Sequence, residues 1–496
     1  MLSIKRTILT LALTLTAALA SAFDIKIASG ERWYGIDQNK TVTIDSKNTI
    51  GNPSFLISNK GRYIYSDQPF DATITDKAVT LSREVKVATG GKSLREAYLY
   101  CFHRNFREQQ PSIEKSLYSS IIYDLRGSKE YLGVNGDLVS CVDKIIAEGW
   151  PKGIILLGDD WQTSLGSYAV DEQYYTNLSE QIQKIKEKGF KIIVSITPYV
   201  SASGRMFNNY KNQGLLVTDP QSGEPIIIET KGYGYAAIFD ITASGAIQIA
   251  KNHLAKNKAN YGFDGIFTDC GIAADPSINP KHQEFKNLWN ALCDNTSMPL
   301  NIKSYNAGHY TPSITTYKYQ TLSNAENFLT DYLSKGFMYM PFNAVAIHCG
   351  NGLDNQSQIS RYLQSTGLSP MCMVPFLPYA IEDNTIKANA KSIVDMREKL
   401  SSYILESLEE SLVTGEPLIR SLEYMYPRQG FYDCYDQYML GTRYLVVPPK
   451  GDSNTRTVRF PKGHWYGPNG EHIKGPVVKS ITIKDSQMLY FSNQKQ

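Results

Sequence analysis

The feature that most constrains the fold of this chain is a regular alternation of apolar strands and amphipathic helices across residues 116–414. Gly153–Leu157 and Lys191–Thr197 are short apolar runs typical of buried strands, whereas Glu172–Gly189 and Ala246–Tyr261 have the length and spacing of helices. Strands that alternate with helices in this way pair in parallel. The sequence therefore predicts βα units around a parallel sheet in the middle of the chain.

The regions on either side of this unit show a different pattern. Short runs of alternating apolar and polar residues are separated there by Gly, Asn, Asp and Pro; examples are Thr41–Ile44, Pro53–Ile57, Arg62–Tyr65, Val79–Lys86, Gln437–Leu440, Tyr444–Val447 and Thr455–Phe460. This pattern is typical of antiparallel β-sandwiches. We expect an N-terminal β-sandwich over residues 23–115, the parallel unit over residues 116–414 and a C-terminal β-sandwich over residues 415–496.

Acidic residues follow two of the expected strands. The stretch Tyr261–Gly271 contains a buried strand that ends at Asp269, and the strand Gly153–Leu157 is followed by Asp159 and Asp160. In a (β/α) barrel the carboxyl ends of the strands converge on one mouth, so these three carboxylates would face whatever the barrel binds. The alternative is that Asp269, and one of the other two, caps the helical turn that follows, because such loops favour Asp.

The composition excludes several classes of partner. The net charge is +3, from 51 basic and 48 acidic residues, with no basic stripe, so neither nucleic acid nor an anionic membrane is an expected partner. The seven cysteines form no CxxC pair, so no zinc site is expected. The 33 tyrosines are compatible with sugar binding, although aromatic residues also suit β-sandwich strands.

The first residues of the chain have the pattern of a secretory signal peptide. Within Met1–Ala22 a charged start is followed by the apolar run Ile8–Leu19 and the small residues Ala20-Ser21-Ala22. We expect cleavage before Phe23, export to a periplasm, a lumen or the medium, and no membrane span after cleavage. An uncleaved anchor is the alternative, although the apolar run is short for one.

Several motifs, in the right order, resemble glycoside hydrolase family 31, most closely the branch of secreted and lumenal α-glycosidases related to myogenesis-regulating glycosidase. The resemblance covers nearly all of the expected mature chain. The motifs that carry it are Pro53–Tyr63, Gly158-Asp159-Asp160-Trp161-Gln162, Ile196-Thr197-Pro198-Tyr199, Phe263–Gly271, Glu416–Leu422 and Asp436–Pro449.

This resemblance implies a (β/α)8-type TIM barrel flanked by N-terminal and C-terminal antiparallel β-sandwich domains, the first of them galactose-mutarotase-like. It also implies a retaining mechanism with two carboxylates and no metal or organic cofactor. Asp269 matches the nucleophile position, and Asp159 and Asp160 match the position that binds hydroxyls of the donor sugar. Trp161 and Tyr199 are expected as an apolar wall at the mouth, or alternatively as core residues.

The sequence departs from the family pattern at the proton donor. The family carries an acidic triplet after the sixth strand, and the simplest alignment puts Asn351 at the acid, where an amide cannot donate the proton. A shift of three residues puts Asp354 there, and we expect Asp354 to be the acid/base, with a solvated loop acid as the alternative. The Asp-Ile-Gly-Gly run of the family and its later Arg and His are also absent, so the donor pocket is smaller or differently built.

The expected function is therefore hydrolysis of an α-linked glycoside, of the α-galactosidase or α-glucosidase type, with net retention. Two alternatives stay open: a catalytically impaired carbohydrate-binding protein derived from such an enzyme, or an α-transglycosylase. The sequence predicts a carbohydrate substrate, but it selects neither the sugar, the linkage nor the oligomeric state.

Overall fold

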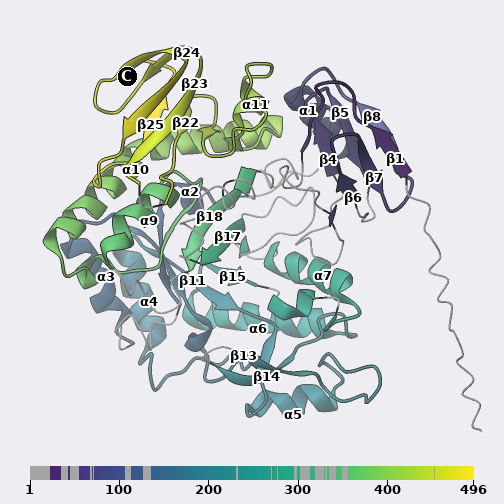
Figure 1. Ribbon diagram of the computed structural model, residues 1–496. Coiled ribbons are helices and arrows are strands. Elements are labelled where there is room, and N and C mark those ends of the chain that lie inside the picture. The colour runs from purple at the N-terminus through teal and green to yellow at the C-terminus, as the bar shows by residue number, and fades with distance from the viewer. Residues whose placement is uncertain are drawn as a thin grey trace, which may run out of the picture.

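Figure 1 shows the structure of the chain, a computed structural model. It describes residues 23–34, 43–44, 55–66, 70, 72–106, 113–126, 136–230, 233–269, 271–275, 277–294, 299–301, 313–318, 329, 332–333, 342–348, 356–451 and 453–495. Two predictions, the signal peptide Met1–Ala22 and the acid/base Asp354, lie outside these residues.

The middle of the chain forms an eight-stranded parallel barrel, which confirms the predicted fold class. Its strands are β9 (Ile121–Leu125), β10 (Gly153–Leu157), β11 (Lys191–Ile196), β15 (Gly265–Thr268), β16 (Pro299–Asn301), β17 (Ser313–Lys318), β18 (Asn343–His348) and β19 (Cys372–Val374). They pair in chain order from β9 to β18, and β19 pairs with the other edge of β9. Since β18 and β19 also contact each other, the sheet closes into a barrel.

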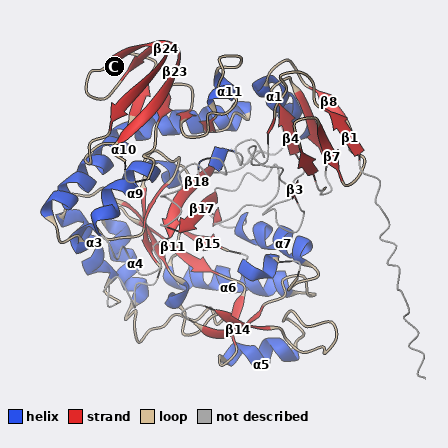
Figure 2. Ribbon diagram, in the orientation of Figure 1, coloured by secondary structure: helices blue, strands red, loops and turns tan. Residues whose placement is uncertain are grey.

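Helices cover the outside of the barrel (Figure 2). They include α2 (Ser116–Ser119), α3 (Leu138–Ala147), α4 (Leu178–Glu187), α6 (Ala246–Tyr261), α7 (His282–Asp294), α9 (Ile359–Thr366) and α10 (Asn384–Thr414). Side-chain caps fix two of their starts: Asp137 Oδ1 accepts the Ser140 N–H at 2.9 Å, and Asp383 Oδ1 accepts the N–H groups of Thr385 and Ile386 at 2.7 and 2.9 Å.

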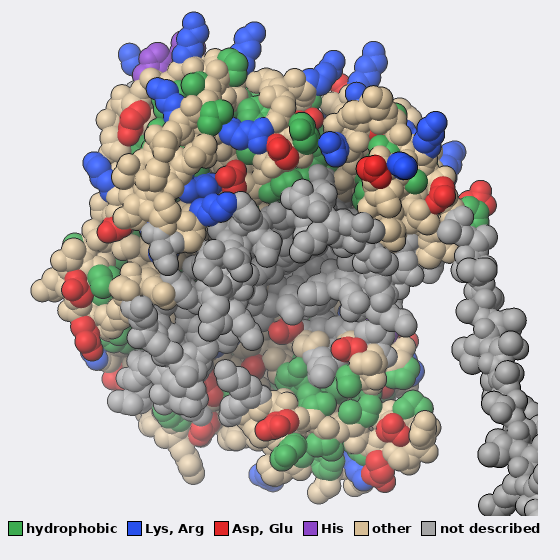
Figure 3. Space-filling model, viewed as in Figure 1, with side chains coloured by type: hydrophobic (Ala, Val, Ile, Leu, Met, Phe, Trp, Pro, Cys, Tyr) green, Lys and Arg blue, Asp and Glu red, His purple; other side chains and the backbone are tan. Residues whose placement is uncertain are grey.

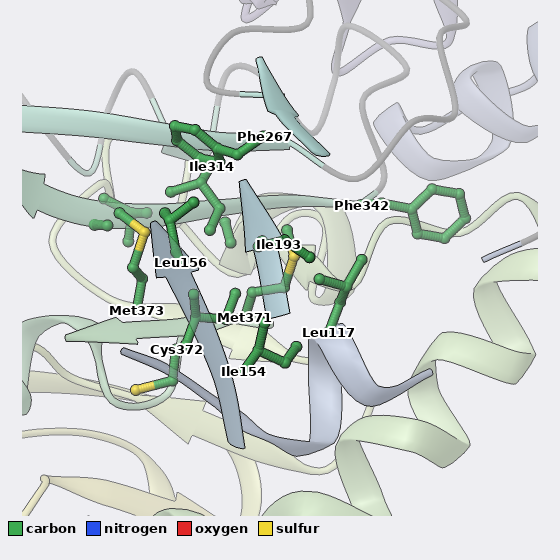
Figure 4. Close-up of a cluster of buried hydrophobic side chains, with 14 of the residues drawn as sticks. Leu117, Ile154, Leu156, Ile193, Phe267, Ile314, Phe342, Met371, Cys372 and Met373 are labelled. Atoms are coloured by element: carbon green, nitrogen blue, oxygen red, sulfur yellow. The ribbon is translucent and has the colours of Figure 1, made fainter. Parts of the chain in front are cut away.

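Apolar side chains fill the barrel. Figure 4 shows Leu156, Ile193, Phe267 and Met373, which come from four different strands, gathered in one cluster. Each of these side chains is fully buried. The barrel is therefore a packed core rather than a channel, and polar chemistry is confined to the strand ends and the loops beyond them.

The insertion between β11 and α6 was not predicted. It contains β12 (Tyr199–Ser201), α5 (Arg205–Asn212), β13 (Ile227–Thr230) and β14 (Gly234–Ile238), and the strands form a separate antiparallel sheet in the order β12-β14-β13. Strands β16 and β17 were also missed, because β16 has three residues and β17, Ser-Ile-Thr-Thr-Tyr-Lys, lacks an apolar run. The strand expected at Phe337–Pro341 lies outside the described residues.

The N-terminal domain contains two four-stranded antiparallel sheets, with strand orders β1-β7-β6-β3 and β2-β4-β5-β8. Their strands are β1 (Phe23–Lys26), β2 (Trp33–Tyr34), β3 (Thr43–Ile44), β4 (Phe55–Ser58), β5 (Arg62–Tyr65), β6 (Ala72–Ile74), β7 (Ala78–Leu81) and β8 (Val87–Thr89). The expectation of strands alone in this region was wrong, because α1 (Leu94–Asn105) follows β8. The sequence signal for this helix is Ser93 followed three residues later by Glu96, and Ser93 Oγ does accept the Glu96 N–H.

The C-terminal domain is antiparallel, as predicted. Its described residues form one six-stranded sheet, with the order β20 (Ile419–Arg420), β21 (Tyr438–Leu440), β22 (Tyr444–Val446), β25 (Tyr490–Ser492), β23 (Thr455–Tyr466) and β24 (His472–Thr482). The short helix α11 (Leu422–Met425) packs against α1 of the N-terminal domain. At this contact the rings of Tyr98 and Tyr424 meet edge to face at 5.6 Å, and Arg95 Nε donates to Glu416 Oε1 at 2.7 Å.

Two further properties bear on the class of protein. Among the described residues, no helix combines the length and the apolar character needed to cross a membrane. Within the same part of the chain, no three His, Cys, Asp or Glu side chains are grouped as metal ligands. Cys141, Cys372 and Cys434 are buried thiols.

Candidate active site

Asp269 lies directly after the fourth strand of the barrel, at its carboxyl end. Its Oδ1 accepts the Gly271 N–H at 2.8 Å, at the start of the 3₁₀ helix Gly271–Ala274. The capping role considered from the sequence is therefore present. It does not exclude a second role, because Asp269 is only partly buried and also lines a pocket.

This pocket has a volume of about 320 Å³ and lies at the carboxyl ends of the second, third and fourth strands. It brings together three of the predicted site residues, Asp159, Tyr199 and Asp269. Its other lining residues are Leu165, Thr197, Ile228, Glu229, Thr230 and Tyr233. The volume is near the lower end of the range for small-molecule sites, about 300–1,000 Å³, and the lining is rich in hydrogen-bonding groups. Figure 3 shows acidic and hydrophobic side chains together on the lower part of the face in view.

The carboxyl of Asp159 has a pKa that its surroundings in the pocket raise. Burial raises its pKa to about 6, against the opposing effects of a hydrogen bond from the Ser195 side chain and of the nearby Arg126 charge. The carboxylates of Asp160 and Asp269 raise it further. Asp159 Oδ1 is buried without a hydrogen-bond partner among the described residues. A polar atom held in this way beside a pocket is ready to accept a hydrogen bond from a ligand.

Asp160 and Trp161 are not among the described residues that line this pocket. The expectation that Trp161 forms a wall of the mouth was wrong. Its side chain is 0% exposed, Nε1 donates to the Ser195 carbonyl at 2.8 Å, and the ring packs on Phe263 at 5.6 Å. Trp161 is a core residue, the alternative that the sequence left open. The backbone of its neighbour Asp160 is hydrogen-bonded to the hydroxyl of Tyr233, which lines the pocket.

Arg126 is a site residue that sequence reasoning missed. It follows β9, the first strand, and donates to both carboxylate oxygens of Asp124, from Nε at 2.8 Å and from Nη2 at 2.6 Å. Its guanidinium also lies 4.7 Å from the ring centroid of Phe267. Burial lowers the pKa of Arg126, but the carboxylates of Asp124, Asp159 and Asp269 raise it above its ordinary value. Arg126 therefore places a fixed positive charge among the acids of the mouth.

Tyr233, at the turn of the β13–β14 hairpin, was missed as well. Its side chain is 39% exposed, but its hydroxyl reaches inward and is hydrogen-bonded to the backbone of Asp160. Burial, together with the charges of Asp159 and Asp160, raises the pKa of this phenol well above its ordinary value. A neutral Tyr233 thus connects the inserted hairpin to the end of the second strand and encloses the pocket from that side.

Tyr199 lies across the pocket close to the Asp269 loop. A Cβ added at Gly271 would lie 2.0 Å from Tyr199 Oη and 2.7 Å from Cζ, so only glycine leaves room for this phenol. Gly271 also has φ = +51°, a conformation that glycine adopts at little cost. The loop that holds the Asp269 carboxylate and the Tyr199 wall are therefore packed as one unit.

The strand count corrects the reasoning about the proton donor. The loop that contains Asn351 and Asp354 was taken to follow the sixth strand, but β18, which precedes it, is the seventh. The sixth strand is β17, and the only carboxylate in residues 319–328 that follow it is Glu326. Both loops follow carboxyl ends of barrel strands, which share one mouth.

The sequence also matches models of a known protein family. The sequence model of the glycosyl hydrolases family 31 TIM-barrel domain matches residues 123–341, and that of the family's C-terminal domain matches residues 415–493. Together they cover more than half of the chain.

Individual relatives are more distant. Myogenesis-regulating glycosidase of Mus musculus is 20% identical over 364 residues, which are 68% of this chain and 51% of the relative. An α-glucosidase of Saccharolobus solfataricus is 38% identical over 97 residues, 19% of this chain and 14% of that enzyme. The chain thus spans about half, or less, of the length of these relatives. A solved dextranase of Flavobacterium johnsoniae superposes with a TM-score of 0.80 at 17% identity, over 95% of this chain and 66% of that one, which shows a shared fold.

Proposed function

Because the chain belongs to glycoside hydrolase family 31, we propose that it hydrolyses an α-linked glycoside with net retention, through a covalent intermediate on Asp269. The observation that carries this proposal is the shared pocket of Asp269 and Asp159 at the ends of the fourth and second strands. Two carboxylates at one mouth of a barrel are suited to a reaction in which positive charge develops on a sugar ring.

In the proposed reaction one carboxylate oxygen of Asp269 attacks the anomeric carbon as the glycosidic bond breaks. The leaving oxygen takes a proton from a carboxylic acid, and the same residue, now a carboxylate, later removes a proton from the water that releases the sugar. The hydrogen bond from the Gly271 N–H to Asp269 Oδ1 fixes the carboxylate in one orientation. Such positioning lowers the entropic part of the barrier.

We assign Asp159 to the hydroxyls of the donor sugar. Asp159 lines the pocket, its Oδ1 has no hydrogen-bond partner among the described residues, and a carboxylate accepts short, charge-assisted hydrogen bonds from hydroxyls. Asp160 supports this site through its backbone contact with Tyr233, and Tyr199 supplies an aromatic wall.

The proposed proton donor is Asp354, and Glu326 is its competitor because it follows the sixth strand. Either residue completes the pair of carboxyls that retention requires. The donor sugar is proposed to be a galactoside or a glucoside. The names of the relatives, which include α-glucosidases, an α-xylosidase and sulfoquinovosidases, leave this choice open. Export is part of the proposal and is supported by the signal-peptide pattern of Met1–Ala22.

The test is release of aryl leaving groups from α-galactosides, α-glucosides and α-xylosides, with Asp269→Ala as the control. Turnover of one sugar that is lost in the variant supports the glycosidase and names its donor. If a folded wild-type protein releases nothing but a sugar still raises its Tm, the protein is a carbohydrate-binding descendant of such an enzyme. A product longer than the substrate would instead indicate transfer to a second sugar.

A further inference from the structure

Two histidines meet on the outer face of the C-terminal sheet. His464 lies in β23 and His472 lies in β24, and both side chains are exposed. Figure 3 shows histidine side chains at the top of the molecule, where Figure 1 places these two strands. Neither histidine is among the described residues that line the pocket, and the proposed hydrolysis uses neither of them. Their contact therefore needs an explanation of its own.

The pairing of the two strands places both histidines on one face. Tyr466 lies directly opposite His472, and His464 comes two positions before Tyr466 on the same strand. The pair between them, Trp465 and Ile473, is buried in the core of the domain. Since side chains alternate between the faces of a strand, the two histidines point outward and are diagonal neighbours.

The two imidazole rings direct one nitrogen each at the other. His464 Nδ1 and His472 Nε2 are 2.9 Å apart. The ring planes differ by 21° and the ring centroids are 5.1 Å apart, so the two facing nitrogens lie between the rings. The ring of Tyr466 is stacked on that of His472, with centroids 4.8 Å apart and planes 4° apart. Stacking on one ring and the short contact between the nitrogens hold the pair in a defined geometry.

This separation is the one that two neighbouring ligands of a metal ion need. Two imidazole nitrogens bound at a right angle, each at about 2.0–2.1 Å from the ion, lie about 2.9 Å apart. Tetragonal sites of this kind are typical of Cu²⁺ and Ni²⁺. Without a metal, one ring donates its N–H to the nitrogen of the other. A metal ion can replace this hydrogen bond when that proton moves to the outer nitrogen of its ring, which leaves a lone pair on both facing nitrogens.

The donor set selects among metals. Imidazole nitrogens suit Cu, Ni and Zn, whereas Mg²⁺ and Ca²⁺ prefer oxygen ligands. Glu471, the acid beside His472, is occupied in its own loop, because its carboxylate oxygens accept hydrogen bonds from the backbone N–H and the side-chain amide of Asn469. Lys474, directly opposite His464, adds a positive charge to this face. A cation held by charge alone is therefore disfavoured here, and a metal that bonds to nitrogen is favoured.

We propose that His464 Nδ1 and His472 Nε2 form a bidentate site for a divalent transition metal, with Cu²⁺ bound more tightly than Ni²⁺ or Zn²⁺. This order is the general one for nitrogen ligands. Two protein ligands leave the other coordination positions to water, in keeping with the finding that no three potential ligands are grouped in the described part of the chain. The site is independent of the proposed hydrolysis, whose steps use carboxylates.

The experiment is calorimetric titration of Cu²⁺ into the whole protein, purified without a histidine tag. His464→Ala and His472→Ala should each weaken Cu²⁺ binding at least about tenfold, because a single imidazole loses the advantage of a second ligand already in place. His103→Ala is the matched control, since His103 is an exposed histidine of α1, and its affinity should equal that of the wild type. Wild-type affinity in the double variant His464→Ala/His472→Ala overturns the site. So does an equal loss in His103→Ala, which would mean that Cu²⁺ binds any surface histidine.

Electron paramagnetic resonance of the bound Cu²⁺ identifies the ligands directly. The wild type should show coupling to two imidazole nitrogens, and either single variant should show coupling to one. The Tm of each variant without metal should stay close to that of the wild type, as is usual for substitutions of exposed side chains, so a lost site is not a lost fold. The same number of coupled imidazoles in the wild type and in both single variants would refute the proposal.

Discussion

The phenol of Tyr199 occupies the space that a side chain on Gly271 would need. The contact couples the pocket wall to the loop that holds Asp269, because the Gly271 N–H is also the donor to the Asp269 carboxylate. Two parts of the site that come from different strands therefore depend on the absence of one methyl group.

For Gly271→Ala we expect a fall in kcat/KM of at least tenfold on the best aryl glycoside, with a small loss of stability. The added Cβ pushes Tyr199 away and strains a residue at positive φ, at about 1 kcal/mol for the backbone alone. Gly430→Ala is the control, since Gly430 also has positive φ, +84°, but has no atom within 4 Å of the added Cβ. If Gly271→Ala and Gly430→Ala have the same kcat/KM, the contact with Tyr199 does not contribute to activity.

Because the pKa of Asp159 is raised in the folded protein, its contribution to the free energy of unfolding should decrease as the pH rises. Its stabilising contribution is complete below its ordinary value near 4, where it is protonated in both states, and is lost as the pH rises through about 6. A shift of this size corresponds to at most about 3 kcal/mol. In urea unfolding from pH 4 to pH 7, Asp159→Asn should gain stability relative to the wild type as the pH rises. A difference that does not change with pH would contradict the raised pKa.

The Arg126 and Asp124 pair should show strong coupling. Arg126→Met leaves the Asp124 carboxylate, which is 4% exposed, buried without its cation, and we expect a loss of about 3–5 kcal/mol. The double variant Asp124→Leu/Arg126→Met should recover most of this stability, because it removes both charges. It should not recover activity, since Asp159 and Asp269 still lack their neighbouring cation. Urea unfolding and kcat/KM of the wild type, Arg126→Met, Asp124→Leu and the double variant give both results, and full activity in the double variant would assign Arg126 to stability alone.

Arg397 should matter for stability but not for turnover. Its guanidinium is buried in α10 and donates to the carbonyls of Tyr118, Gly367, Ser369 and Pro370, and no carboxylate of the described residues pairs with it. Arg397→Met leaves these acceptors unpaired, so we expect a loss of at least about 2 kcal/mol, seen as a lower Tm. Well below the Tm, kcat should equal that of the wild type. A change in kcat without a change in Tm would refute this role.

The proton donor can be identified through the leaving group. The variant that removes the donor, Asp354→Asn or Glu326→Gln, should lose about 10²–10⁴-fold in kcat/KM on glycosides with poor leaving groups and much less on dinitrophenyl glycosides, which need no protonation. Azide should restore part of its rate. Glu382→Gln, at an exposed acid, serves as the control. If neither variant discriminates between leaving groups, the donor is a third residue or the chain is a binding protein.

The barrel was predictable because its apolar strands and helices follow their periodic patterns closely; β10 and α6 begin and end at the expected residues. β17 was not predictable in this way, since four of its six residues are Ser, Thr or Lys. Because of this omission, the loop that contains Asp354 was counted as following the sixth strand, whereas it follows the seventh, β18.

Site residues were predictable from the sequence where a carboxylate directly follows a barrel strand. Asp159, Asp160 and Asp269 were expected at one mouth for that reason, and Tyr199 was expected there from the family resemblance; the structure brings Asp159, Tyr199 and Asp269 to one pocket. Arg126 was missed although it also follows a strand, because only acids were sought there. Tyr233 could not have been found from local sequence, since its position depends on an inserted hairpin that folds back over the mouth.

The contact between α1 and α11 has a consequence for how the chain is made. The Arg95 guanidinium meets Glu416, which lies 321 residues later in the sequence. During synthesis the N-terminal domain emerges from the ribosome long before its partner surface exists. Tyr98, fully buried against Tyr424 in the finished molecule, lacks this contact until Tyr424 has left the ribosome. Docking of the N-terminal domain on α11 is therefore expected to be a late step of folding, and removal of α11 would leave the N-terminal domain with an uncovered face.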